Sequence, residues 1–176
     1  QVEEQLALRN IQPAFHKGWR ITDKGALECA KEAAGELRLD IEAAFSQGLP
    51  NTPMAHSSMR VISGNFITAR PMGILEGVDL QHTGLVRKID VTAIQLSLNS
   101  SAIVLLSTIG FSPTGEAFNL TMEDVATSTA RAIKADKLIF VTQIEGIFDK
   151  SGKLMEELEL DRAREIMLQD DLPELT

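Results

Sequence analysis

The sequence of 176 residues contains one cysteine, one tryptophan and no tyrosine. A single thiol cannot form an internal disulfide, and this scarcity is compatible with a reducing compartment. Cys29 falls inside a helical pattern, where we expect a buried structural thiol rather than a nucleophile. No secretory signal is visible, but the chain opens on Gln1 without an initiator methionine, so this absence decides nothing about the compartment. We predict a cytoplasmic protein, in keeping with the single cysteine.

Basic residues are also scarce, with 17 lysines and arginines against 25 aspartates and glutamates and a formal net charge of −8. No basic patch offsets the charge of nucleic-acid phosphates, so we expect no nucleic-acid partner. The longest uncharged apolar run, Ala102–Leu106, is too short to cross a bilayer, so we expect no membrane partner. The length and the 44% of apolar residues are typical of about one globular domain.

Motifs for metals and phosphates are missing as well. The three histidines, His16, His56 and His82, are scattered, with no cysteine or carboxylate at metal-ligand spacing. No glycine motif of the kind that cradles phosphate precedes a predicted helix. We therefore expect neither a metal site nor a bound cofactor in this chain.

The most informative stretch runs from Ala102 to Asp149. Ala102–Ser107 and Lys137–Thr142 are short apolar runs rich in β-branched residues, which predicts two strands covered on both faces. Between them Thr121 is placed to cap a helix, with Asp124 as its capping-box partner. The apolar stripe of this helix consists of Met122, Val125, Ala126, Thr129, Ala130 and Ile133. The pattern predicts a right-handed βαβ unit.

The remaining pattern extends this unit into a three-layer αβα sandwich around a mostly parallel sheet. Ligands bind such sheets at the carboxyl ends of the strands, so the loops after Ser107 and Thr142 are candidate sites. The other predicted helices are Gln1–Arg9, a long helix capped by Thr22 or Asp23 and ending near Gln47, one capped by Asp90, and one capped by Asp161. The other predicted strands are Ile11–Phe15, Arg60–Ser63, Asn65–Ala69 and Gly84–Lys88.

The ends of the sequence do not match a closed domain of this kind. Gln1–Arg9 reads as the latter part of a helix, and the tail Asp170–Pro173 ends without completing a domain. We expect the chain to be an excerpt that is incomplete at its N-terminus and at its C-terminus.

Three residues have side chains suited to a ligand. Arg20 follows Trp19 at the entry to a helix, where its guanidinium could grip a carboxylate. Asn119 lies just before a helix N-terminus, which favours anions. Lys137 begins the second predicted strand. From spacing alone, the better interpretations are purely structural. Arg20 would form a surface ion pair, Asn119 would be a turn or cap residue, and Lys137 would be a solvated flank of its strand.

Several segments resemble the amino-acid-kinase (carbamate-kinase-like) fold and, within it, the acetylglutamate branch. Gly18–Asp23 is similar to its G-x-R-V-T-D element, and Phe118–Leu120 and Ala135–Thr142, with Gly146 and Asp149, are similar to Y-N-x-x-x-D and A-x-K-L-x-x-L-T-D-x-x-G-x-x-D. Gly64–Pro71, Gly77–Gly84 and Ser112–Glu116 resemble bacterial N-acetylglutamate synthases rather than the kinases. The resemblance covers essentially the whole chain.

The resemblance implies a regulatory rather than a catalytic domain. In such synthases the amino-acid-kinase-like domain binds L-arginine as an effector. A separate acetyltransferase domain, absent from this chain, transfers acetyl from acetyl-CoA to L-glutamate in the first committed step of arginine biosynthesis. The family also implies a homo-oligomer, for which the predicted Asp23–Gln47 helix is a candidate contact. One alternative is acetylglutamate kinase, which phosphorylates N-acetyl-L-glutamate with ATP. Another is a stand-alone α/β ligand sensor with no attached enzyme.

The departures from the kinase pattern favour the synthase. Glu123 stands where the kinases have a catalytic aspartate, and Gln143 replaces the aspartate after the strand threonine. The resemblance makes these two, with Arg20 and Asn119, vestigial kinase substrate positions, and leaves no catalytic residue. Lys137 matches the lysine that contacts arginine in sensitive relatives. Its ammonium can meet only the effector's carboxylate, so the guanidinium needs acidic or carbonyl partners elsewhere. We expect these partners beyond Thr176, and part of the site in a helix that precedes Gln1.

Overall fold

The structure, a computed structural model, describes residues 2–47, 59–142, 146–149 and 153–168. Two compact units are present, Gln1–Leu138 and Ile139–Thr176. The described helices are α1 (Val2–Leu8), α2 (Lys24–Ser46), α3 (Val91–Asn99), α4 (Met122–Ile133) and α5 (Leu160–Leu168). The described strands are β1 (Ala14–His16), β2 (Trp19–Ile21), β3 (Val61–Ser63), β4 (Ile67–Pro71), β5 (Ile74–Leu75), β6 (Val78–Asp79), β7 (Gly84–Ile89), β8 (Ile103–Leu105), β9 (Ile109–Phe111) and β10 (Ala117–Asn119).

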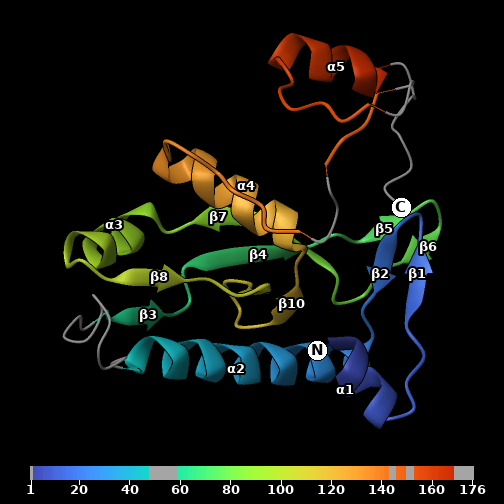
Figure 1. The fold of residues 1–176 in the computed structure, drawn as a ribbon. Helices are drawn as coiled ribbons and strands as arrows, with labels where there is room; N and C mark the ends of the chain where they lie inside the picture. The colour runs from blue at the N-terminus through green and yellow to red at the C-terminus, as the bar shows by residue number, and fades with distance from the viewer. Residues whose placement is uncertain (1, 48–58, 143–145, 150–152, 169–176) are drawn as a thin grey trace. The chain divides into compact units, whose positions relative to one another are not determined.

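The first unit has the predicted three layers. In Figure 1, α3 and α4 lie on one side of the strands and α2 lies on the other. The main sheet has the order β10-β9-β4-β7, and β3 pairs with β8 in a separate two-stranded sheet. The predicted α/β class is therefore confirmed.

Strand directions are more mixed than the mostly parallel sheet that we predicted. Among the described strands, β3–β8 and β4–β9 pair in parallel, whereas β4–β7 and β9–β10 pair antiparallel. The cause is local, because β9 and β10 are joined by a tight turn. In that turn Ser112 N donates to Glu116 O over 2.8 Å, and Gly115 has φ of +85°. Two strands joined by so short a connection must run antiparallel.

Two further hairpins share one turn chemistry that the sequence analysis did not identify. The β1–β2 loop is Lys17-Gly18 and the β5–β6 loop is Glu76-Gly77, and all four residues have positive φ. Positive φ at both central positions defines the type I′ turn, whose twist suits a two-residue hairpin. The two tips are linked by an ion pair of 3.3 Å between Lys17 Nζ and Glu76 Oε2.

The predicted helix starts are largely confirmed. Asp23 caps α2, where its Oδ1 accepts from Ala26 N over 2.7 Å. Asp90 caps α3 in the same way at 3.0 Å from Ala93 N, and Thr121 caps α4 at 3.2 Å from Asp124 N. Asp161 is wrong as a cap, because it lies inside the first turn of α5.

The predicted strand at Lys137–Thr142 is absent from the structure. These residues follow α4 without regular secondary structure, and the side chains of Ile139 and Val141 are 76% and 91% exposed. An apolar β-branched sequence favours a strand, but a strand also needs a neighbour to bond. The first half of the predicted βαβ unit is confirmed by β8 and α4, and its second strand is wrong.

The core of the first unit lies between the sheet and the helices. Its buried residues come from β4, β7, β10, α3 and α4, with Phe66 and Leu120 beside them. A smaller cluster joins α1 to α2 through Leu6, Ala26 and Cys29. Cys29 is 0% exposed, which confirms the expectation of a buried thiol.

Candidate functional site

A cavity of about 300 Å³ brings two of the predicted site residues together. We call it the Arg20 pocket. Its wall combines the β1–β2 hairpin, the end of β10 and the start of α4, and Val2 comes from α1. It is lined by Val2, Phe15, Gly18, Trp19, Arg20, Thr83, Thr108, Asn119, Leu120 and Thr121. Arg20 and Asn119, 99 positions apart in the sequence, thus face one space.

Arg20 is held from two sides. One terminal nitrogen, Nη2, pairs with the Glu3 carboxylate of α1, and the guanidinium carbon lies 4.8 Å from the centre of the Phe15 ring. The other nitrogen, Nη1, is buried and has no hydrogen-bond partner among the described residues. The ion pair that spacing favoured is therefore present. It uses only part of the donor capacity of the guanidinium.

Asn119 belongs to a hydrogen-bonded threonine cluster. Its Nδ2 donates to Thr22 Oγ1 over 3.3 Å, and the hydroxyls of Thr22 and Thr83 lie 2.9 Å apart. Thr83 Oγ1 also accepts from Thr22 N over 3.2 Å and donates to Arg20 O. Thr22 is 0% and Thr83 4% exposed, so the cluster is a buried link between β2 and the start of β7. It sets the orientation of the Asn119 amide.

The chemistry of the Arg20 pocket suits a small anion. A guanidinium, an amide and the N-terminus of α4 are all donors or positive dipole ends, and they converge on one cavity. The Glu3 carboxylate already pairs with one nitrogen of Arg20, and the Glu116 carboxylate lies 3.8 Å from His82 Nε2. The pocket could hold a carboxylate.

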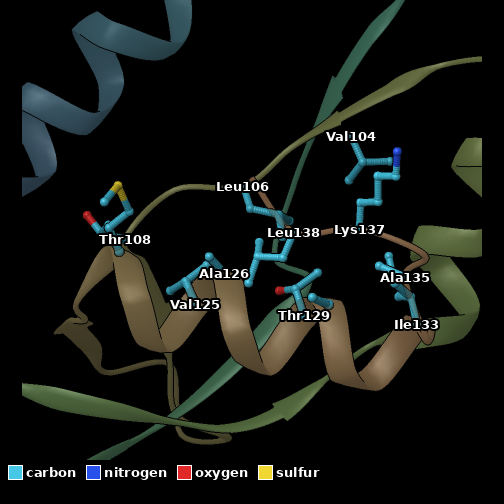
Figure 2. A pocket seen from close by; sticks show the side chains of 12 residues that line it. Val104, Leu106, Thr108, Val125, Ala126, Thr129, Ile133, Ala135, Lys137 and Leu138 are labelled. Atoms are coloured by element: carbon cyan, nitrogen blue, oxygen red, sulfur yellow. The ribbon is translucent and has the colours of Figure 1, made fainter. Parts of the chain in front are cut away.

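Lys137 lies in a different cavity of about 360 Å³, which we call the Lys137 groove. It is lined by Val104, Leu106, Thr108, Met122, Val125, Ala126, Thr129, Ala130, Ile133, Ala135, Lys137 and Leu138. Figure 2 shows the side chains of β8 and its continuation on one side and those of α4 on the other. Lys137 supplies the single charge among these residues and is itself exposed. Thr108 is the one residue that lines both cavities.

Of the two positions that depart from the kinase pattern, the structure describes only Glu123. Glu123 lies in the first turn of α4 and is exposed, and it lines neither of the two cavities. Gln143 lies outside the described residues. No group of histidines, cysteines and carboxylates among the described residues could hold a metal ion.

Sequence analysis missed Thr22 and Thr83 as parts of the site. Both are small polar residues at strand boundaries, where they look like ordinary turn or cap residues. Thr22 competes with Asp23 as a helix cap, and only the structure assigns the cap to Asp23 and Thr22 to the buried cluster.

Comparison with known protein families identifies the class of protein that has this layered α/β fold and the Arg20 pocket. The model of the amino acid kinase family matches residues 1–173, so this chain belongs to the amino acid kinase family. In the part of the chain that the structure describes, no helix is long and apolar enough to cross a membrane.

Within that family the similar proteins are acetyltransferases. An amino-acid acetyltransferase of Ralstonia nicotianae is 67% identical over 94% of this chain and 37% of its own length. One from Pseudomonas fluorescens is 51% identical over 90% of this chain and 37% of its length. The chain thus spans little more than a third of the curated relatives that it matches.

A solved structure agrees with these relatives. The N-acetylglutamate synthase of Neisseria gonorrhoeae, complexed with coenzyme A and L-arginine, matches with a TM-score of 0.83 and 33% identity. The match covers 93% of this chain and 38% of that one. The resemblance to N-acetylglutamate synthases that the sequence motifs indicated is confirmed.

Proposed function

We propose that this chain is the arginine-binding regulatory domain of an N-acetylglutamate synthase. The complete protein would transfer acetyl from acetyl-CoA to L-glutamate, the first step of arginine biosynthesis, in the cytoplasm. The observation that carries this proposal is the 67% identity to an amino-acid acetyltransferase over nearly the whole chain. The acetyltransferase domain would lie outside residues 1–176, and the protein would be a homo-oligomer.

The altered carboxylates support a domain without kinase activity. Glu123 is one methylene longer than the aspartate of the kinase pattern, and its side chain lies outside the Arg20 pocket. A transfer reaction depends on groups held in place to within about 0.5 Å, so this change would misplace the carboxylate. Arg20 and Asn119 would remain as inherited scaffold.

Lys137 is the residue of this chain that we assign to the effector. Its ammonium is exposed at the rim of the Lys137 groove, where it could meet the carboxylate of arginine. The groove offers no carboxylate for the guanidinium, so acidic or carbonyl partners must come from elsewhere in the protein. The proposed site is thus shared between this chain and further polypeptide.

The test is an assay of the full-length protein for acetyl transfer from acetyl-CoA to glutamate, with and without arginine. We expect activity, and we expect Lys137→Gln to weaken arginine binding by about tenfold or more, as the loss of a charged hydrogen bond implies. Lys134→Gln is the matched control, because Lys134 is exposed and does not line the groove. Absence of acetyl transfer would overturn the proposal.

Acetylglutamate kinase is the second candidate, because Arg20 and Asn119 still face one pocket. The same protein can be incubated with ATP and N-acetyl-L-glutamate. We expect no acyl phosphate to form. ATP-dependent phosphorylation of N-acetylglutamate would instead favour the kinase.

A further inference from the structure

The neutral hydrogen-bonding groups around the Arg20 pocket are already used within the chain. Asn119 Nδ2 donates to Thr22 Oγ1 over 3.3 Å. At the N-terminus of α4, Thr121 Oγ1 accepts from Asp124 N over 3.2 Å. A free anion that entered this pocket would therefore depend on the guanidinium of Arg20, which is the one charged group of the lining.

Glu3 supplies a carboxylate to this guanidinium from α1. It pairs with Nη2 of Arg20, and its neighbour Val2 lines the pocket. The side chain of Arg20 is only 19% exposed, whereas that of Glu3 is 62% exposed. An ion pair that is partly shielded from water is stronger than one at the surface. The two charges also cancel, so the pair leaves little net attraction for a further anion.

The carboxylate of Glu3 is held in place by contacts that do not involve Arg20. Leu6 of α1 is buried against α2, and Arg9, at the end of α1, pairs with Glu32 of α2. Since the helix is docked by these contacts, little freedom remains to be lost when the ion pair forms. A carboxylate tethered in this way has a high effective concentration and competes well with a free one.

We propose that Glu3 is an internal carboxylate that occupies Arg20 and closes the Arg20 pocket to free carboxylates. A free carboxylate must displace Glu3 from Nη2 before it can contact both terminal nitrogens of the guanidinium. The pocket is thus self-inhibited while α1 is docked. The inference rests on the proposed function, in which Arg20 and Asn119 hold no ligand, and it assigns the cause to Glu3.

Trp19 provides a site-specific signal for the test. It lines the pocket and is the one tryptophan of the 176 residues. The complete polypeptide is labelled with fluorotryptophan, and the fluorine NMR resonance of Trp19 is assigned with Trp19→Phe. Acetate is the probe, and acetamide, which has a similar shape and no charge, is the control ligand. Binding elsewhere in the polypeptide is thereby separated from binding in the pocket.

Removal of the Glu3 charge should open the pocket. We expect Glu3→Gln to bind acetate about tenfold or more tightly than the unaltered protein, as the loss of a competing charged hydrogen bond implies. Adding Arg20→Gln should abolish this gain, and acetamide should not distinguish the variants. Glu4→Gln is the matched control, because Glu4 is the next residue of α1 and is exposed.

Two acetate results would overturn the proposal. One is an equal affinity in Glu3→Gln, Glu4→Gln and the unaltered protein, and the other is a gain that survives Arg20→Gln. Acetyl transfer and arginine play no part in these measurements. Failure of this inference is therefore distinguishable from failure of the proposed function.

Cys29 shows whether α1 stays docked in these variants. This thiol is 0% exposed and packs with Leu6 of α1. We expect a thiol reagent to modify Cys29 at the same rate in Glu3→Gln and in Glu4→Gln, as followed by peptide mass spectrometry. Faster modification in Glu3→Gln alone would overturn the proposal, because Glu3 would then be a structural tie for α1.

Discussion

The carboxylate of Asp124, in the first turn of α4, accepts a hydrogen bond of 2.7 Å from the backbone N–H of Val86 in β7. The same carboxylate accepts from Ser128 Oγ over 3.0 Å. Asp124 was predicted as a capping-box partner for Thr121, but its side chain is turned toward the sheet instead. One side chain therefore ties α4, the helix that lines the Lys137 groove, to β7.

Removing this carboxylate should loosen α4 from the sheet. We expect Asp124→Ala to lower the free energy of unfolding by about 1–3 kcal/mol, because the Val86 N–H loses its charged partner. Asp124→Asn retains an oxygen acceptor and should lose less. Urea denaturation measures both, and Glu123→Gln is the control because Glu123 is exposed in the same helical turn. Equal losses for all three variants would contradict this role.

Gly110 is required by close packing of β9 against its neighbours. A Cβ at this position would lie 2.8 Å from Ala69 Cβ and 2.8 Å from Leu120 Cδ1. Gly110→Ala should therefore cost about 1–3 kcal/mol of stability, as overpacking does. Gly35→Ala in α2 meets no atom within 4 Å and should instead stabilise the helix by up to about 1 kcal/mol. Thermal or urea unfolding compares the two, and the same sign for both would refute the packing explanation.

Thr83 should be more sensitive than its small size suggests. Thr83→Val preserves the shape of the side chain but removes the hydroxyl that bonds Thr22 and the Arg20 carbonyl. We expect a loss of about 1–3 kcal/mol, because buried polar groups lose a partner. Thr127→Val is the matched substitution at an exposed helical position and should change stability by about 0.5 kcal/mol or less. A neutral Thr83→Val variant would show that the cluster is dispensable.

One ion pair gives a prediction for acid titration. The hydrogen bond from Lys31 holds the pKa of Glu28 below the ordinary value of a glutamate. Because the pKa is lowered in the folded state, this contribution to stability is present above the ordinary value and is lost as the pH falls through the folded pKa. Lys31→Gln should raise the pKa of Glu28 in an NMR titration. Lys24→Gln removes only a longer-range charge and should raise it less.

Local signals in the sequence predicted much of the fold. Asp23, Asp90 and Thr121 are helix caps whose bonds depend only on residues three positions away. Such contacts can be inferred from short patterns. Lys137–Thr142 shows the limit, because strand formation depends on a distant neighbour that a local pattern does not reveal.

The candidate site shows the same contrast between local signals and contacts of distant residues. Spacing alone gave no reason to place Arg20 beside Asn119, and the family resemblance supplied that link. The structure brings them to one pocket through the threonine cluster, whose hydrogen bonds join residues 61 and 97 positions apart. No short motif encodes contacts of that range. Polar contacts between distant strands had to be observed.

The burial of Cys29 makes this thiol a probe of local opening in the unaltered protein. This sole thiol is packed with Leu6 of α1 and Ala26 of α2, and it is 0% exposed. A thiol reagent can reach it only when α1 moves away or α2 unfolds. The rate at which such a reagent modifies the unaltered protein therefore measures how often α1 detaches. The same helix carries Glu3, the partner of Arg20.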